Sequence, residues 1–182
     1  GCHVVEFSPE EKARFQEAGV KVMVEDWDVM EQLNHKDQAY RLFQREGIGI
    51  VPEHYIVTNA EQFQARYEQL ARQYGKVCFK FVKDEGGKSY RLIDNDRRGY
   101  TALFRKMTTR MPFEAAMEAL SERESFPPVI VMPYLPDEEI SVDCLMTATG
   151  LIAIPRVKDA TRIEKIRYDE RILSYCRDLY EK

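Results

Sequence analysis

The chain has 182 residues, of which 44% are hydrophobic and 32% are charged, a composition typical of a folded domain or two small lobes and not of a disordered chain. Its 27 basic and 31 acidic residues are interspersed and give a formal net charge of −4. Because there is no basic block and no apolar run of the ~20 residues that a membrane span needs, we expect neither a nucleic-acid nor a membrane partner.

The cysteines predict free thiols. Cys2, Cys78, Cys144 and Cys176 are far apart in the sequence, contain no C-x-x-C pair and are not grouped with the three histidines. This pattern favours reduced side chains in a cytoplasmic protein and argues against a zinc site.

The first part of the chain predicts helices around one short strand. Residues 8–11, Ser-Pro-Glu-Glu, are a helix start with a capping serine, a proline at the first position and a glutamate that can reach back. Residues 20–24 alternate in polarity and predict a strand, and residues 29–33 predict a short helix. Asn34 is the expected cap of a further helix over 36–46, which the following glycine ends.

A second helix-forming region follows an extended connector. Residues 47–52 hold two glycines and end in a proline, which disfavours helix. Residues 54–57 predict a strand. Thr58 and Glu61 form a second expected capping box, and the helix behind it should end at Gly75.

The middle of the chain predicts two strands around a polar turn. Residues 77–82 and 90–93 have the apolar character of buried strands, and residues 83–89 between them contain two adjacent glycines. Two helical stretches are expected next, near 100–107 and 113–120.

The last third predicts a strand, a linker, a hairpin and a helix. Residues 129–132 are a hydrophobic strand and residues 133–137 a linker. Residues 140–146 and 151–156 predict a β-hairpin, and residues 169–180 an amphipathic helix. The order of elements predicts an α+β fold with mostly antiparallel pairing and a seam in the linker.

Lys80 is the first residue that indicates chemistry. It lies inside an otherwise apolar strand, where an ammonium group is costly unless it reaches the surface or meets an anion. Gly86, Gly87 and Ser89 follow in the turn, and glycines allow backbone N–H groups to approach a ligand closely. The alternative is an edge-strand lysine beside an ordinary hairpin turn.

Two further positions fit an anionic ligand with a base and a sugar. Lys36 opens a helix, where a cation is slightly unfavourable unless an anion lies nearby. Residues 129–143 lead from a buried strand through a linker into an acidic strand, whose backbone and carboxylates could contact an adenine and a ribose. A solvated lysine and a surface acidic loop are the alternatives.

Taken together, these features resemble the ATP-grasp superfamily, especially its carbamoyl-phosphate-synthase-like branch. Residues 79–91, with Phe-Lys-Phe followed by Glu-Gly-Gly and Tyr-Arg, are similar to the lysine strand and glycine loop of that branch. Residues 132–143 look like its hinge, and residues 154–156 like its next strand. The resemblance covers about residues 30 to 180 and implies an ATP-grasp-like fold of two small α/β lobes joined by a hinge.

The resemblance also divides the chain. Residues 1–35 would be the tail of a preceding α/β domain, and 36–133 the lobe with the lysine strand and glycine loop. Residues 134–182 would begin a second lobe that this chain does not complete.

The resemblance implies a role for each candidate residue. The residues that would bind the nucleotide are Lys36, Lys80, Gly86, Gly87, Ser89, Met132, Tyr134, Leu135 and Glu139. The two lysines would hold the α- and β-phosphates, the glycine loop would close over them, residues 132–135 would line the adenine, and the glutamate would hold the ribose. Arg156 is a weak catalytic candidate that faces the substrate or the γ-phosphate, and a solvated strand-end charge is the alternative.

The activity that the resemblance implies is ATP-dependent ligation of a small-molecule carboxylate to an amine through an acyl phosphate, with ATP and Mg²⁺. Two departures qualify it. Pro133 stands where the family usually has a glutamate, and the acidic and Glu-x-Asn metal ligands of the family are not found in this chain. We therefore expect weak ATP binding and no turnover by the chain alone. A non-catalytic nucleotide-binding or regulatory module and a plain interaction domain are the alternatives.

Overall fold

The computed structural model describes residues 8–22, 24–84, 87–96, 109–158 and 165–181, which belong to two compact units. The first unit comprises Gly1–Arg41 and Pro52–Tyr134, and the second comprises Leu42–Val51 and Leu135–Lys182. Both contain helices and a sheet, so the predicted α+β class with mostly antiparallel pairing is confirmed.

The first unit is built on a five-stranded sheet in the order β1-β5-β2-β3-β4. Its strands are β1 (Tyr55–Val57), β2 (Val77–Phe81), β3 (Arg91–Ile93), β4 (Arg110–Met111) and β5 (Val129–Pro133). All neighbours pair antiparallel except β3 and β4, which are parallel. The last strand in sequence, β5, is inserted between β1 and β2 and is buried along its whole length.

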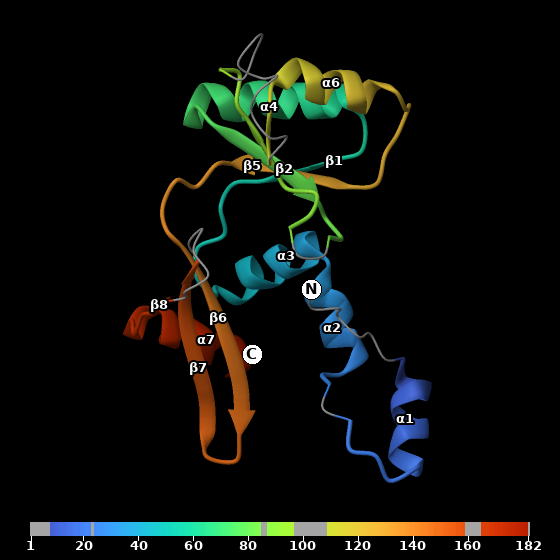
Figure 1. Ribbon diagram of the computed structural model, residues 1–182, viewed down its shortest axis with the longest axis vertical. Coiled ribbons are helices and arrows are strands. Elements are labelled where there is room, and N and C mark those ends of the chain that lie inside the picture. The colour runs from blue at the N-terminus through green and yellow to red at the C-terminus, as the bar shows by residue number, and fades with distance from the viewer. Residues whose placement is uncertain (1–7, 23, 85–86, 97–108, 159–164, 182) are drawn as a thin grey trace. The chain divides into compact units, whose positions relative to one another are not determined.

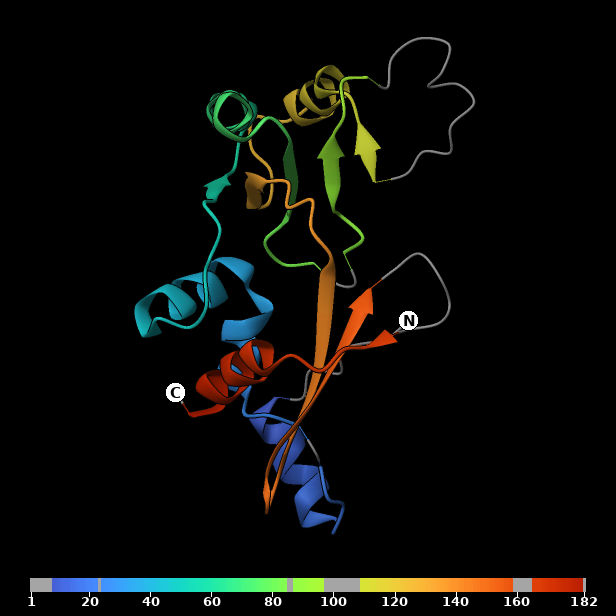
Figure 2. The ribbon, with the colours of Figure 1, turned by 90° about the vertical axis from the view of Figure 1, so that its left-hand side faces the viewer.

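One face of this sheet is covered by α4 (Ala60–Tyr74) and α6 (Phe113–Ser121), which lie side by side in Figures 1 and 2. Val129 and Val131 of β5 pack there with Phe63 and Leu70 of α4, and none of the four is more than 2% exposed. Because side chains alternate along a strand, the residues between them point to the other face.

The opposite face of the sheet carries the residues of interest for function. Lys80 pairs with Ile130, and Cys78 with Met132, in the register of β2 and β5. The apolar cluster on this face consists of Cys78, Leu92 and Met132, with Tyr90 and Tyr134 packed against it. Lys80 therefore lies on the same face as an apolar surface, away from α4 and α6.

The helix boundaries follow local capping chemistry. In α1 (Pro9–Glu17), Ser8 and Glu11 form the predicted capping box. The cap of α4 is Asn59, whose side chain accepts from the N–H of Gln62, so the box expected one residue earlier at Thr58 and Glu61 is wrong. Asparagine is the better cap, and the Thr58 N–H donates instead to the Gln62 side chain.

Two other local expectations change. The strand expected at residues 20–24 is wrong, because the described residues there, 20–22 and 24, form no strand. Asn34 is the last residue of α2 (Trp27–Asn34), and α3 (Lys36–Glu46) begins two residues later with the predicted bounds. The helix expected near 100–107 lies outside the described residues.

The longer segment of the second unit, Leu135–Lys182, holds a three-stranded antiparallel sheet and one helix among its described residues. Its elements are β6 (Glu139–Thr147), β7 (Gly150–Lys158), β8 (Lys165–Ile166) and α7 (Glu170–Glu181). Figure 2 shows β6 and β7 as a long twisted hairpin, and α7 contacts β7. None of the helices in the described part of the chain combines the length and apolar character that a membrane crossing requires.

Candidate functional site

Lys36 connects the start of α3 to the end of β2. Its ammonium group donates to the carbonyl oxygens of Val82, at 3.1 Å, and Asp84, at 3.2 Å. Its backbone N–H also points to the Val82 carbonyl, at 3.4 Å. The Lys36 charge is therefore held where β2 leads into residues 83–89, called the glycine turn below.

Lys80 lies on β2, two residues before Val82, and its side chain is half-buried. Its ammonium group makes no hydrogen bond or ion pair with the residues that the structure describes. Its neighbour across the sheet, Ile130, is fully buried, so the base of the Lys80 side chain is enclosed by apolar atoms. An ammonium group in such a place gains from an anionic partner.

The two lysines interact electrostatically. Burial lowers the pKa of Lys36, the nearby Lys80 charge lowers it further, and the Asp84 carboxylate opposes both effects. Two ammonium groups that lie close together in a partly buried site repel each other. An anion with several oxygens can bind both groups and relieve this repulsion. The structure thus brings together two of the predicted phosphate-binding residues.

The glycine turn is fastened by a contact that the sequence did not predict. The Ser89 hydroxyl donates to Asp84 Oδ2 at 2.7 Å, and the Ser89 backbone N–H donates to the same oxygen at 3.1 Å. The hydroxyl also accepts from the Phe81 N–H at 2.9 Å. Gly87 has φ +68°, a left-handed conformation that favours glycine, and Gly86 lies outside the described residues.

The residues predicted to line an adenine lie partly on the apolar cluster. Met132 is 6% exposed and packs on the sheet face that carries Lys80, and the Tyr134 N–H donates to the Lys76 carbonyl at 2.8 Å. Pro133 is buried at the end of β5, and its carbonyl accepts a weak bond from the Cys78 thiol. Leu135 belongs to the second unit and is 58% exposed.

The remaining candidates lie in the second unit and are paired with neighbours there. The Glu139 carboxylate accepts from Lys158 Nζ at 2.8 Å, directly across the hairpin. Arg156 contacts both oxygens of Asp143, each at 2.9 Å. Arg156 lies opposite Ser141, which stands two residues after Glu139 and two before Asp143. Because alternate residues of a strand and directly opposed residues of an antiparallel pair share a face, these four charges lie on one face of β6 and β7.

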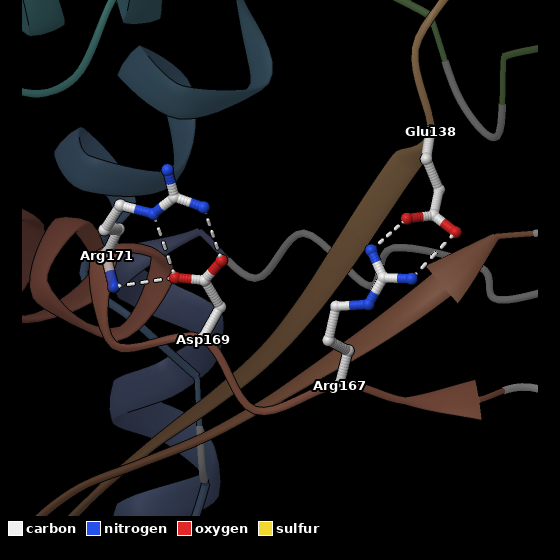
Figure 3. Close-up of polar contacts among 4 residues, drawn as sticks. All are labelled: Glu138, Arg167, Asp169 and Arg171. Carbon is white, nitrogen blue, oxygen red and sulfur yellow. Dashed lines mark hydrogen bonds and ion pairs between the residues drawn. The ribbon is translucent and has the colours of Figure 1, made fainter.

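Two further ion pairs hold the ends of this unit (Figure 3). Glu138, just before β6, forms a forked ion pair with Arg167, just after β8. Asp169 accepts from the Arg171 backbone N–H at 2.9 Å, which caps the start of α7, and also binds the Arg171 side chain. The forked pair fixes the chain at the point where it enters the hairpin.

The described part of the chain holds no ready-made metal cluster. Among the described ranges there is no group of three or more His, Cys, Asp or Glu side chains that could hold a metal ion. We therefore assign no Mg²⁺ ligand among the described residues.

Comparison with known proteins places the fold. The chain is similar to D-alanyl-alanine synthetase A from Vibrio cholerae O1 biovar eltor str. N16961, with a TM-score of 0.64 and 11% identity over 93% of this chain and 54% of that one. It is also similar to the VanG D-Ala:D-Ser ligase from Enterococcus faecalis, with a TM-score of 0.59, 19% identity, and coverage of 93% and 50%. The ATP-grasp ligase PsnB, solved with a minimal precursor, matches with a TM-score of 0.54, 18% identity and the same coverage.

The fold is therefore that of the ATP-grasp ligases, and the chain spans about half the length of these matched structures. A family described as "ATP-grasp in the biosynthetic pathway with Ter operon" matches residues 125–182, which hold β5 and the Leu135–Lys182 segment of the second unit. No curated protein matches the sequence. The ATP-grasp resemblance is confirmed at this level, and the carbamoyl-phosphate-synthase-like branch stays a prediction.

Proposed function

We propose that the chain is the ATP-binding part of a carboxylate–amine ligase of the carbamoyl-phosphate-synthase-like branch, which acts through an acyl phosphate. The observation that supports this most is the meeting of Lys36 and Lys80 beside the glycine turn, on a sheet face that also offers an apolar surface. The ATP-grasp fold and the family match over residues 125–182 support the same class of activity.

Each group has a role in this reaction. Lys36 and Lys80 bind the α- and β-phosphates, residues Gly86 to Ser89 cover them, and the apolar surface around Met132 receives the adenine. Glu139 binds the ribose hydroxyls once it exchanges its bond from Lys158. A substrate carboxylate attacks the γ-phosphorus, the bond to the ADP oxygen breaks, and an amine then displaces phosphate from the acyl phosphate to form an amide.

The lysines contribute by charge. Phosphoryl transfer spreads negative charge over the transferring group and the leaving ADP, so fixed ammonium groups that need no rearrangement stabilise that state. Mg²⁺ would add further neutralisation, but the described residues do not form a metal cluster, and we assign no ligand to it.

The phosphate role of Lys80 is tested by titrating ATP into the 182-residue chain and its Lys80→Ala variant by calorimetry. A charged hydrogen bond of ~1.5–3 kcal/mol corresponds to a loss of about tenfold or more in affinity. Lys76→Ala is the matched control, because Lys76 precedes the other end of β2. An unchanged dissociation constant for Lys80→Ala would contradict the phosphate role.

A non-catalytic nucleotide-binding or regulatory module is the second candidate function. Pro133, which stands at the end of β5 where the family usually has a glutamate, favours it. Carboxylate-dependent ADP release by the 182-residue chain is assayed across a panel of amino acids, beside the titration of ATP binding. ADP release supports the ligase over the module, and a chain that does not bind ATP contradicts both functions.

A further inference from the structure

The Asp84 carboxylate lies where a phosphate of the proposed nucleotide would find its hydrogen-bond donors. Its Oδ2 accepts from the Ser89 backbone N–H at 3.1 Å and from the Ser89 hydroxyl at 2.7 Å. The same carboxylate is close enough to Lys36 to raise the pKa of that ammonium group, against burial and the Lys80 charge. One internal anion thus faces a backbone N–H, a hydroxyl and a lysine.

These donors are the ones that phosphate oxygens use in protein sites: turn N–H groups, a hydroxyl and an ammonium group. A serine hydroxyl has one proton and cannot donate to a carboxylate and a phosphate oxygen at once. A carboxylate beside the lysines also lowers their attraction for a second anion, since the charge of Lys36 is already partly compensated.

The Asp84–Ser89 contact does more than hold the glycine turn in place. The Ser89 hydroxyl also accepts from the Phe81 N–H at 2.9 Å, and the Lys36 ammonium group donates to the backbone carbonyl of Asp84 at 3.2 Å. The position of the turn therefore has supports that do not need the carboxylate charge. What the carboxylate adds is negative charge at an anion position.

We propose that Asp84 is a built-in competitor for the phosphate position, and that a polyphosphate displaces its carboxylate from Ser89. The inference rests on the proposed function, because it needs a phosphate position beside Lys36 and Ser89. Its consequence is regulatory: the site stays closed to weakly charged anions, and only a ligand with several negative charges outweighs the resident carboxylate.

The test is a calorimetric titration of inorganic tripolyphosphate into the 182-residue chain and its Asp84→Asn variant. Asparagine keeps the size and an acceptor oxygen but removes the charge, so affinity should rise about tenfold. Asp96→Asn is the matched control. Asp96 follows the end of β3, which lies beside the start of β2 and away from the turn, so this change should leave the affinity for tripolyphosphate unaltered. The amide NMR signal of Ser89 should shift on titration, and the remaining amide signals report whether each variant is folded.

A folded Asp84→Asn variant that binds tripolyphosphate equally, more weakly or not at all overturns the competition. Lys80→Ala separates this inference from the proposed function. If Lys80→Ala weakens binding while Asp84→Asn does not tighten it, the phosphate site stands and the competition fails. If Asp84→Asn tightens binding while Lys80→Ala has no effect, the competition stands and the phosphate role of Lys80 fails.

Discussion

Leu70 is fully buried between α4 and the sheet, and its replacement by alanine tests the described core of the first unit. The change removes three carbons, worth ~2.4 kcal/mol at ~0.8 kcal/mol each. The cavity that remains adds to this, because β1, β2, β5 and α6 all contact α4 and limit its collapse. We expect a loss of ~3–4 kcal/mol of unfolding free energy, within the ~2.7–5 kcal/mol range of such substitutions.

The measurement is urea unfolding followed by far-UV circular dichroism. Leu33→Ala in α2 is the matched control, because it removes the same three carbons from a helix and gains the same helix propensity, while Leu33 is 39% exposed. It should cost ~1 kcal/mol or less. Equal losses for the two variants would refute the assignment of Leu70 to the centre of the core.

Three further predictions follow from local chemistry. Asn59→Ala should lower the free energy of unfolding by ~1 kcal/mol, measured by thermal unfolding, and Thr58→Ala should lower it less, because the Asn59 side chain caps α4. A larger loss for Thr58→Ala would instead favour the capping box of Thr58 and Glu61 that the sequence predicts. Gly75→Ala should lower the free energy of unfolding by ~1 kcal/mol or more, since Gly75 has φ +80°. An unchanged midpoint of thermal unfolding would mean that α4 does not end in this left-handed conformation. Burial, aided by a hydrogen bond with Cys176, raises the pKa of Cys144 to about 11. The folded thiol should therefore react with iodoacetamide at pH 8 more slowly than in the urea-unfolded chain, and its contribution to stability should be lost as pH rises from about 9 to about 11. Equal alkylation rates would refute this.

Elements with strong local signals were predictable. The helix over 36–46 has its predicted bounds, because Gly47 with φ +67° ends it and an apolar stripe defines one face. The hairpin of β6 and β7 was also expected, since its strands are long and joined by a short polar turn. In both cases the information lies within a few residues of the element.

Elements that depend on distant partners were missed. Strands β4 and β8 have two residues each and exist only because β3 and β7 offer an edge to pair with. Residues 20–24 have strand-like alternation, but the described ones find no partner. Short alternation is therefore a weak signal without knowledge of which edge is open.

The candidate site likewise contains residues that the sequence predicted and contacts that it did not. Lys36 and Lys80 were proposed from their odd surroundings and a family resemblance, and the structure brings their charges together. The Asp84–Ser89 contact was not predicted, although both residues flank the glycines, because many polar side chains flank turns without meeting. Glu139 lies directly opposite Lys158 in the register of the hairpin, and Arg156 lies diagonally from Asp143. Neither ion pair could be predicted without that register.

The insertion of β5 between β1 and β2 also has a consequence for synthesis. A ribosome makes β1, α4, β2 and β3 before residues 129–133 exist, so β1 and β2 each wait with an unpaired edge. Until β5 arrives, β2 has only β3 as a partner, and Lys80 lacks Ile130 beside it. The nascent first unit is thus open to wrong edge pairing until its central strand emerges, and late closure of the sheet should be the slow step of its folding.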